Sequence, residues 1–301
     1  MLAPVVLFVY NREEHTRMTL EALKKNALAG ESKLFIFSDG ARTEKDAVKV
    51  EKVRKLLKNC QEENVFREVV VTEAERNQGL AASVITGVTK VISEYGKAIV
   101  LEDDIVTAPD FLSYMNQALE YYEKDSRIWS VSGYTMPLES LQKYKKDVFL
   151  SYRASSWGWG SWKDRWELID WEISDFPEFR KDKKRIRMFC RGGKDLYPML
   201  IRQQAGELDS WAVRWCYWQS KCNMLTVYPK DSRVQNIGCD GSGTHEGNAD
   251  IFSSGISEKE KKIFQFSGIE LNKKIIREFY NIYSATLWFR IKNKVRKLVK
   301  V

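Results

Sequence analysis

Short hydrophobic runs alternate with longer amphipathic stretches over the first hundred residues of the chain. The runs predict strands at residues 5–10, 34–38, 69–72 and 98–101. The stretches between them predict helices at residues 13–29, 46–59 and 81–95. This alternation predicts an α/β fold, in which a mostly parallel sheet carries helices on its faces.

Polar residues follow each predicted strand directly. They are Asn11 and Arg12 after the first, Asp39 and Gly40 after the second, and three adjacent carboxylates, 102–104, after the fourth. Open α/β sheets bind ligands at the carboxyl ends of their strands. The pattern therefore predicts a ligand crevice along this edge.

The triplet Glu102-Asp103-Asp104 is the most informative short motif. Three like charges at the end of a buried strand repel one another, so we expect a cationic partner there. A hard divalent ion, Mn²⁺ or Mg²⁺, held by one or two carboxylates and completed by phosphate oxygens, fits this chemistry. The alternative is an acidic turn before a helix, with Asp110 favouring the helix dipole.

The pattern changes after residue 107. A helix is predicted at 111–123 and a strand at 128–132, and nine of the ten tryptophans lie between Trp129 and Trp218. The segment 157–162, Trp-Gly-Trp-Gly-Ser-Trp, is too rich in glycine for a regular element. Composition leaves two interpretations open: an aromatic wall that receives a sugar acceptor, or a tryptophan-rich packing core.

Charge is concentrated at the C-terminal end of the sequence. Residues 269–301 contain nine Lys or Arg and two acids, so most of the net charge of +8 lies there. The near-neutral remainder disfavours a nucleic-acid-binding function. Apolar residues at helical spacing predict a basic amphipathic helix in 269–301, which either contacts an anionic membrane surface or docks on the body with its basic face in solvent.

Five cysteines without a Cys-x-x-Cys pair favour reduced thiols and disfavour a structural zinc site. The sequence shows no signal-peptide pattern and no apolar run long enough to cross a bilayer, which favours a cytoplasmic protein. We divide the chain into three parts, at 1–106, at 107–250 and at 251–301, the last of which contains the basic tail.

Taken in order, these segments resemble glycosyltransferases of the GT-A fold, and in particular the N-acetylglucosaminyltransferase I family with its bacterial relatives. Residues 100–111, Val-Leu-Glu-Asp-Asp-Ile-Val-Thr-Ala-Pro-Asp-Phe, are similar to that family's acidic metal motif and the helix after it. The similarity covers about residues 5–247. Its further segments are 128–132, 157–162, Glu-Leu-Asp-Ser-Trp at 207–211 and Gly-Ser-Gly-Thr-His at 241–245.

The resemblance implies how a nucleotide-sugar donor would be held. Arg12 would bind the diphosphate through its guanidinium, rather than being a surface arginine at a strand end. Asp39 would accept a hydrogen bond from uracil or ribose, rather than only forming an Asp-Gly turn. Gly79 would let the backbone approach the nucleotide closely. The family's nucleobase-contacting histidine falls near Thr86, where this chain departs from the pattern.

The same resemblance divides the acidic triplet by role. Glu102 would face the donor sugar, Asp103 the ribose and Asp104 the metal ion. The ion would neutralise charge on the departing nucleoside diphosphate. Trp211 would also belong to the donor site.

Asp209 is the candidate general base that would take the proton of the acceptor hydroxyl in an inverting transfer. The family segment has two acids where this chain has Asp209 and Ser210, so Glu207 is the second candidate. The alternative role for Asp209 is to cap the helix that follows.

Thr244 and His245 lie in a glycine-rich loop that would close over the diphosphate and exclude water. The alternative is a flexible linker.

We therefore interpret the chain as an inverting, metal-dependent hexosyl- or N-acetylhexosaminyltransferase. It would move a sugar from a UDP-sugar to a glycan or lipid-linked acceptor in polysaccharide assembly, as a peripheral protein on the cytoplasmic face of a membrane. The alternative is a catalytically inactive sugar-binding or membrane-recruited scaffold on the same fold. A nucleotidyltransferase is disfavoured, because no glycine-rich loop follows the first strand.

Overall fold

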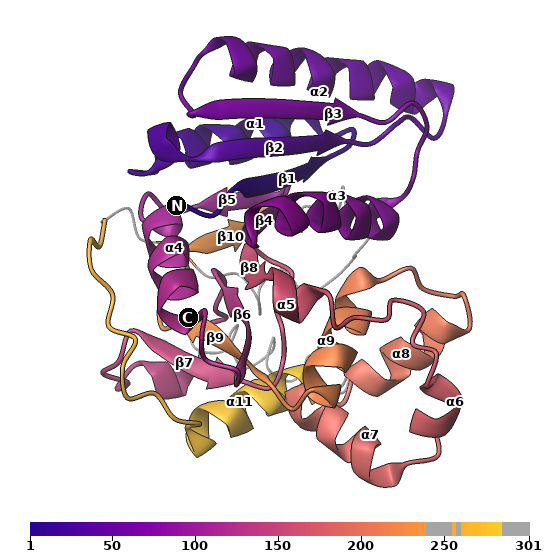
Figure 1. The fold of residues 1–301 in the computed structure, drawn as a ribbon, viewed down its shortest axis with the longest axis vertical. Coiled ribbons are helices and arrows are strands. Elements are labelled where there is room, and N and C mark those ends of the chain that lie inside the picture. The colour runs from indigo at the N-terminus through magenta and orange to yellow at the C-terminus, as the bar shows by residue number, and fades with distance from the viewer. Residues whose placement is uncertain (239–254, 257–259, 285–301) are drawn as a thin grey trace, which may run out of the picture.

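The computed structural model describes residues 1–238, 255–256 and 260–284 (Figure 1). Its strands are β1 (Val5–Val9), β2 (Lys33–Ser38), β3 (Glu68–Glu73), β4 (Lys97–Glu102), β5 (Ile105–Thr107), β6 (Ile128–Ser132), β7 (Val148–Ser151), β8 (Trp159–Trp162), β9 (Leu225–Pro229) and β10 (Val234–Asn236). Its α-helices are α1 (Glu13–Lys24), α2 (Glu44–Glu62), α3 (Leu80–Tyr95), α4 (Phe111–Tyr122), α5 (Lys163–Trp166), α6 (Phe176–Phe179), α7 (Lys183–Phe189), α8 (Leu196–Gln204), α9 (Trp211–Lys221) and α11 (Lys273–Ser284). The short 3-10 helices are η1 (Ala29–Glu31), η2 (Glu139–Leu141) and η3 (Cys190–Gly192).

Eight of these strands form one mixed sheet in the order β3-β2-β1-β4-β8-β6-β9-β7. The first four are parallel to one another, β8 runs antiparallel between β4 and β6, and β7 is antiparallel to β9. Helices cover both faces of the sheet (Figure 1). The predicted α/β class and the strand–helix alternation of the first hundred residues are confirmed.

Strand β1 is buried on both faces, as expected for a central parallel strand. Val5 and Leu7 pack into the hydrophobic core that α1, α2 and α4 cover. Val6 and Phe8 pack into the opposite core, which α3 and α9 cover. This burial fixes the register in which β1 presents the residues that follow it, because a slip by one residue would exchange the two faces.

The prediction that 157–162 is irregular is wrong for residues 159–162, which form the buried strand β8. Trp159 packs into one core and Trp162 into the other, so both rings are used in packing. Gly160 makes the strand possible, since a Cβ there would already press on Met115 and Leu119 of α4 at 3.1 Å. Glycine here allows close packing instead of marking a loop.

The tryptophan-rich region is a packing core. Trp129, Trp159, Trp166 and Trp215 are buried and stack on one another, with ring centroids 4.7–5.7 Å apart. Of the two interpretations that composition left open, the structure selects the packing core for these residues.

A second, two-stranded sheet crosses the carboxyl end of β4. In it, β5 pairs antiparallel with β10, with Ile105 opposite Asn236. The pairing continues through a hydrogen bond from the Ile237 backbone N–H to the Asp104 carbonyl at 2.9 Å. This brings residues 237 and 238 directly over the acidic triplet.

The described start of the basic tail, helix α11, docks on the body. Ile275 and Phe279 are buried, and the Phe279 ring packs against Tyr228 of β9 at 5.3 Å. The Glu278 carboxylate accepts hydrogen bonds from the backbone N–H groups of Glu139 and Ser140, at the start of η2. For residues 273–284 the docked alternative therefore applies. Residues 285–301, including the rest of the predicted helix, lie outside the described residues.

The proposed division of the chain does not coincide with separate sheets or cores. β4 from the first part pairs with β8 from the second, and one core contains residues of both together with Phe279 of the third. Within the described part of the chain, no helix combines the length and apolarity needed to span a bilayer.

We expect Phe279→Ala to lower the free energy of unfolding by about 3 kcal/mol, because a buried ring is replaced by a cavity. Leu271→Ala, at a side chain that is 37% exposed, is the control and should cost less than about 0.5 kcal/mol. Chemical denaturation of the whole chain measures both. Equal, small losses would contradict the docking of α11.

Candidate active site

The candidate site lies where the strand order of the parallel half reverses. The chain builds β1, β2 and β3 outward in one direction and then places β4 on the other side of β1. In such sheets the crevice outside the carboxyl ends of the two strands at the switch point binds ligands. Phe8 of β1 pairs with Glu102 of β4, so Arg12 and the acidic triplet emerge side by side at this edge.

Arg12 supplies a positive charge next to the acidic triplet. Its Nη2 atom donates to Asp104 Oδ2 at 2.9 Å and also contacts Asp103 Oδ1, while its Nε donates to Asp103 Oδ2 at 3.4 Å. The Arg12 side chain is 22% exposed, so part of it is accessible to solvent. Its contact with a donor diphosphate stays a prediction.

The backbone of Asp103 is also held in place by a hydrogen bond. Its backbone carbonyl accepts a hydrogen bond from the buried Thr19 hydroxyl of α1 at 2.8 Å. Burial raises the pKa of the Asp103 carboxyl, and the charge of Arg12 opposes that rise. With both carboxylate oxygens engaged by Arg12, Asp103 is held rigidly; its predicted contact with ribose is untested.

The surroundings of Glu102 disfavour the charged form of its carboxyl group. Burial, followed by the charges of Asp104 and Asp103, raises its pKa to about 8, with Arg12 acting in the opposite direction. A perturbed pKa of this kind is typical of functional sites. Its predicted contact with the donor sugar is likewise untested.

Asp104 offers a free oxygen suited to a metal ion. Its Oδ2 pairs with Arg12, whereas its Oδ1 is buried and finds no hydrogen-bond partner among the described residues. An unpartnered buried carboxylate oxygen is costly unless a ligand uses it. Among the described residues no group of three or more His, Cys, Asp or Glu side chains converges on a metal position. The residues present therefore fit an ion held by one carboxylate and completed by phosphate and water.

Gly238 completes this part of the site, and the sequence motifs did not single it out as a site residue. A methyl group at this position would overlap Asp104 Oδ2, and it would stand 3.0 Å from an Arg12 nitrogen. Only glycine lets the backbone cover the Arg12–Asp104 pair this closely. Its place at the start of the glycine-rich segment 238–247 was the available signal.

Asp39 organises the adjacent loop. Its two oxygens accept backbone hydrogen bonds from Gly40, Gln78 and Gly79 at 2.8–3.1 Å, and one side-chain hydrogen bond from Asn77 at 2.9 Å. These four donors use the acceptor positions of a carboxylate. The structure thus gives Asp39 a positioning role; the predicted hydrogen bond to uracil or ribose is untested and would compete with these contacts.

Gly79 and Asp209 lie next to each other. Gly79 has a φ of 80°, which favours glycine, and a Cβ there would lie 3.8 Å from Asp209 Oδ2. The loop that Asp39 holds therefore reaches the candidate base. This places Asp209 beside the start of α3, at the carboxyl edge of the parallel strands.

Asp209 is accessible and oriented by a cation. Its side chain is 69% exposed, and Arg214 Nη2 donates to its Oδ1 at 3.5 Å. The Arg214 side chain is mostly buried and is held by the carbonyls of Ser210 and Trp171, both at 3.2 Å. The helix-capping alternative for Asp209 is wrong, because the Ser210 hydroxyl caps α9 by accepting from the Val213 N–H.

Trp211 requires a correction. It is 3% exposed, and its ring packs against Trp159 at 5.2 Å, so it lies in the tryptophan core instead of contacting a donor. Trp157 is the aromatic residue better placed for a ligand. It is partly buried, stacks edge-on against Tyr134 at 4.5 Å, and lies two residues before Trp159, whose strand partner is Val100. Trp157 therefore lies just before β8, the strand that pairs with β4.

The predicted residues Thr244 and His245 lie outside the described residues, so their closure over the diphosphate stays a prediction. The structure brings the other candidates to one edge of the sheet in two groups. The first contains Arg12, the triplet and Gly238, and the second contains Asp39, Gly79 and Asp209.

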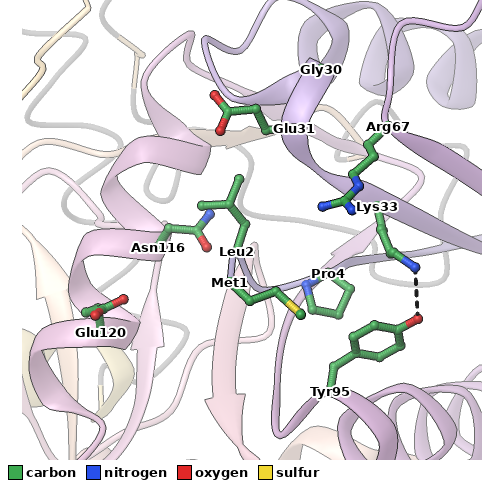
Figure 2. A pocket seen from close by; sticks show the side chains of 10 residues that line it. All are labelled: Met1, Leu2, Pro4, Gly30, Glu31, Lys33, Arg67, Tyr95, Asn116 and Glu120. Atoms are coloured by element: carbon green, nitrogen blue, oxygen red, sulfur yellow. Dashed lines mark hydrogen bonds between the residues drawn. The ribbon is translucent and has the colours of Figure 1, made fainter.

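A cavity of about 630 Å³ lies at the opposite edge of the sheet (Figure 2). Pro4, Lys33 and Arg67 immediately precede or begin β1, β2 and β3, so the cavity opens at the amino ends of these strands. Lys33 is already paired with Glu68 at 2.6 Å and donates to the Tyr95 hydroxyl at 3.4 Å. This cavity is lined by both positive and negative side chains and lies at the other edge of the sheet, so it is distinct from the candidate active site.

The sheet topology, with the acidic triplet and Arg12 at its switch point, defines an α/β protein with a candidate ligand site at the carboxyl ends of its parallel strands. The model of the GNT-I family matches residues 1–166, which is more than half of the chain. The chain belongs to the GNT-I family.

Comparison with solved structures finds S. aureus TarS. One structure of TarS has a TM-score of 0.31 and 17% identity, over 51% of this chain and 22% of TarS. TarS 1–349 gives a TM-score of 0.46 and 13% identity, over 78% of this chain and 59% of the other. The structure of TarS 1–349 in complex with UDP gives a TM-score of 0.40 and 14% identity, over 56% of this chain and 48% of the other. The chain thus spans well under two thirds of these proteins, and no curated protein sequence matches it.

We expect Gly238→Ala to weaken manganese-dependent binding of UDP by about tenfold or more, because the added methyl group displaces the Asp104 carboxylate and Arg12. Gly255→Ala is the matched control, since a Cβ there meets no atom within 4 Å. Titration calorimetry measures both affinities. An unchanged affinity in Gly238→Ala would contradict the placement of residue 238 over the site.

Proposed function

We propose that the protein transfers a hexose or N-acetylhexosamine from a UDP-sugar to a hydroxyl of a glycan or lipid-linked acceptor, with inversion at the anomeric carbon. The observation that carries this proposal is the buried, unpartnered Oδ1 of Asp104 beside Arg12 at the switch point. Membership of the GNT-I family supports the nucleotide-sugar class of donor.

The donor would bind with its diphosphate toward Arg12. A guanidinium pairs with phosphate oxygens bidentately, and the Arg12 side chain is partly exposed. When the diphosphate binds, Arg12 would share its donors between the phosphates and the two carboxylates it now contacts. The Asp39 loop, which holds Gly79 in its positive-φ conformation, supports the nucleoside side of the crevice.

Asp104 would hold a divalent ion, Mn²⁺ or Mg²⁺, through its free Oδ1. When bound, the ion supplies charge neutralisation for the leaving nucleoside diphosphate. The Asp103 carboxylate, paired with Arg12, lies beside this position, and Gly238 covers one side of it by close backbone approach.

The chemical step would use Asp209 as general base. Its exposed carboxylate would take the proton of the acceptor hydroxyl while that oxygen attacks the anomeric carbon. The bond from that carbon to the diphosphate oxygen breaks, and the nucleoside diphosphate leaves with the electron pair. Arg214 would keep Asp209 oriented through its 3.5 Å ion pair. Trp157 would pack against a sugar face.

The acceptor and the cellular location are proposed from the C-terminal residues. A lipid-linked acceptor in polysaccharide assembly agrees with the basic character of residues 269–301, whose lysines and arginines would hold the enzyme at the cytoplasmic face of a membrane. A catalytically inactive scaffold on the same fold is the alternative; it would bind the nucleotide or sugar without turnover.

We expect Asp209→Asn to reduce kcat by about 10²–10⁴-fold while the affinity for UDP stays near that of the unaltered protein, because only proton abstraction is lost. Release of UDP from a panel of UDP-sugars, with a mixed glycan acceptor, measures transfer. Glu207→Gln is the control and should retain activity.

A larger loss in Glu207→Gln than in Asp209→Asn would reassign the base to Glu207. Metal-dependent UDP binding without transfer from any donor in the panel would instead favour the scaffold.

A further inference from the structure

A basic segment lies within the body of the protein, apart from the C-terminal tail. Residues 180–194 contain eight Lys or Arg and a single acid, Asp182. Residues 1–268 as a whole have a net charge of only +1, so this segment is a strong local concentration. The total charge of the body is near neutral, but its charges are unevenly distributed.

Three exposed cations of this segment lie on α7. Lys183, Lys184 and Arg187 are exposed, and within the described part of the chain none of them pairs with a carboxylate. Asp182 does not neutralise them, because one of its oxygens caps the helix by accepting from the Lys184 and Arg185 N–H groups. α7 thus presents three solvated positive charges.

Helix α11 extends this positive surface. It contacts η3, just after α7, where the Lys194 N–H donates to the Ser284 hydroxyl at 3.0 Å. Because Ile275 and Phe279 face the core, Lys273, Lys274 and Arg277 remain exposed on the outer side of α11.

The turn after η2 adds a third group at the other end of α11. Lys143, Lys145 and Lys146 are exposed there, and η2 is joined to α11 through Glu278. Glu139 and Glu270 are the exposed acids close to these lysines. We call the exposed lysines and arginines of α7, α11 and residues 143–146 the basic face. In Figure 1, α7 and α11 lie along the lower edge of the molecule, opposite α2.

We propose that the basic face docks on an anionic lipid bilayer. Each Lys or Arg near an anionic membrane contributes to binding, and the contributions of a flat group of them add up. The described chain leaves this face at Ser284, and the following sequence 285–301 has six Lys or Arg, no acid, and the apolar residues Leu287, Trp288 and Phe289. Basic residues mixed with aromatic and aliphatic ones favour a lipid interface over a purely polyanionic partner.

This surface goes beyond a membrane-binding tail, because cations of the folded body take part in it. Arg12, Asp104 and Asp209 of the candidate active site do not belong to the basic face. The inference concerns binding alone and does not depend on the proposed transfer reaction.

The test is co-flotation of the whole chain with vesicles of phosphatidylcholine containing phosphatidylglycerol, against phosphatidylcholine alone. We expect binding only to the anionic vesicles, weakening as salt is raised. Each lysine or arginine near the membrane contributes about fivefold to the affinity. The triple variant Lys183→Glu, Lys184→Glu, Arg187→Glu should therefore bind at least about tenfold more weakly. Lys52→Glu, Lys55→Glu, Lys58→Glu on α2 makes the same charge change on the opposite side and should bind as the unaltered protein does.

Circular dichroism checks that each variant is folded. If the triple Glu variant is not folded, the neutral Lys183→Gln, Lys184→Gln, Arg187→Gln variant should still bind more weakly.

Equal binding by the α7 and α2 variants would overturn the proposal and leave the tail as the only contact. Binding to soluble polyphosphate but not to vesicles would overturn the lipid bilayer as occupant. A protein that binds anionic vesicles but transfers no sugar would refute the proposed function and leave this inference standing.

Discussion

The pairing of Arg12 with Asp103 and Asp104 is the interaction on which the rest of the site depends. Two parallel strands buried on both faces end side by side and would leave three carboxylates facing one another with little water to screen them. A single guanidinium pairs with two of the carboxylates but carries only one positive charge, and the third carboxyl, Glu102, has a raised pKa. The remaining excess of negative charge, with Asp104 Oδ1 unpartnered, is a site prepared for a cation.

Much of this was predictable from the sequence because it is local. The apolar runs around β1 and β4 predicted the strands, and the polar residues directly after them predicted which side chains meet at the switch point. Arg12, Asp39 and the acidic triplet each lie within a few residues of a strand that the pattern identifies. For these residues, predicting the sheet was enough to predict the edge at which they gather.

The errors concern residues whose role is set by distant parts of the chain. Composition cannot distinguish a tryptophan that lines a site from one that fills a core, so Trp211 was misplaced, and Trp157 was not separated from Trp159. Gly238 matters only because β10 pairs with β5 and carries it over Asp104. Total charge hid the basic segment at 180–194, because a sum over 268 residues averages opposite charges that the fold separates.

Titration of the protein with UDP in the presence and absence of Mn²⁺, for the unaltered chain and for Asp104→Asn, tests the central claim most directly. The substitution keeps the shape of the side chain and removes the charge and one metal-binding oxygen, and Asp231→Asn, at an exposed position, is its control. The account predicts that UDP binding requires Mn²⁺ and is lost in Asp104→Asn alone. Metal-dependent UDP binding that is equally strong in Asp104→Asn, or nucleotide binding without any metal dependence in the unaltered chain, would contradict it.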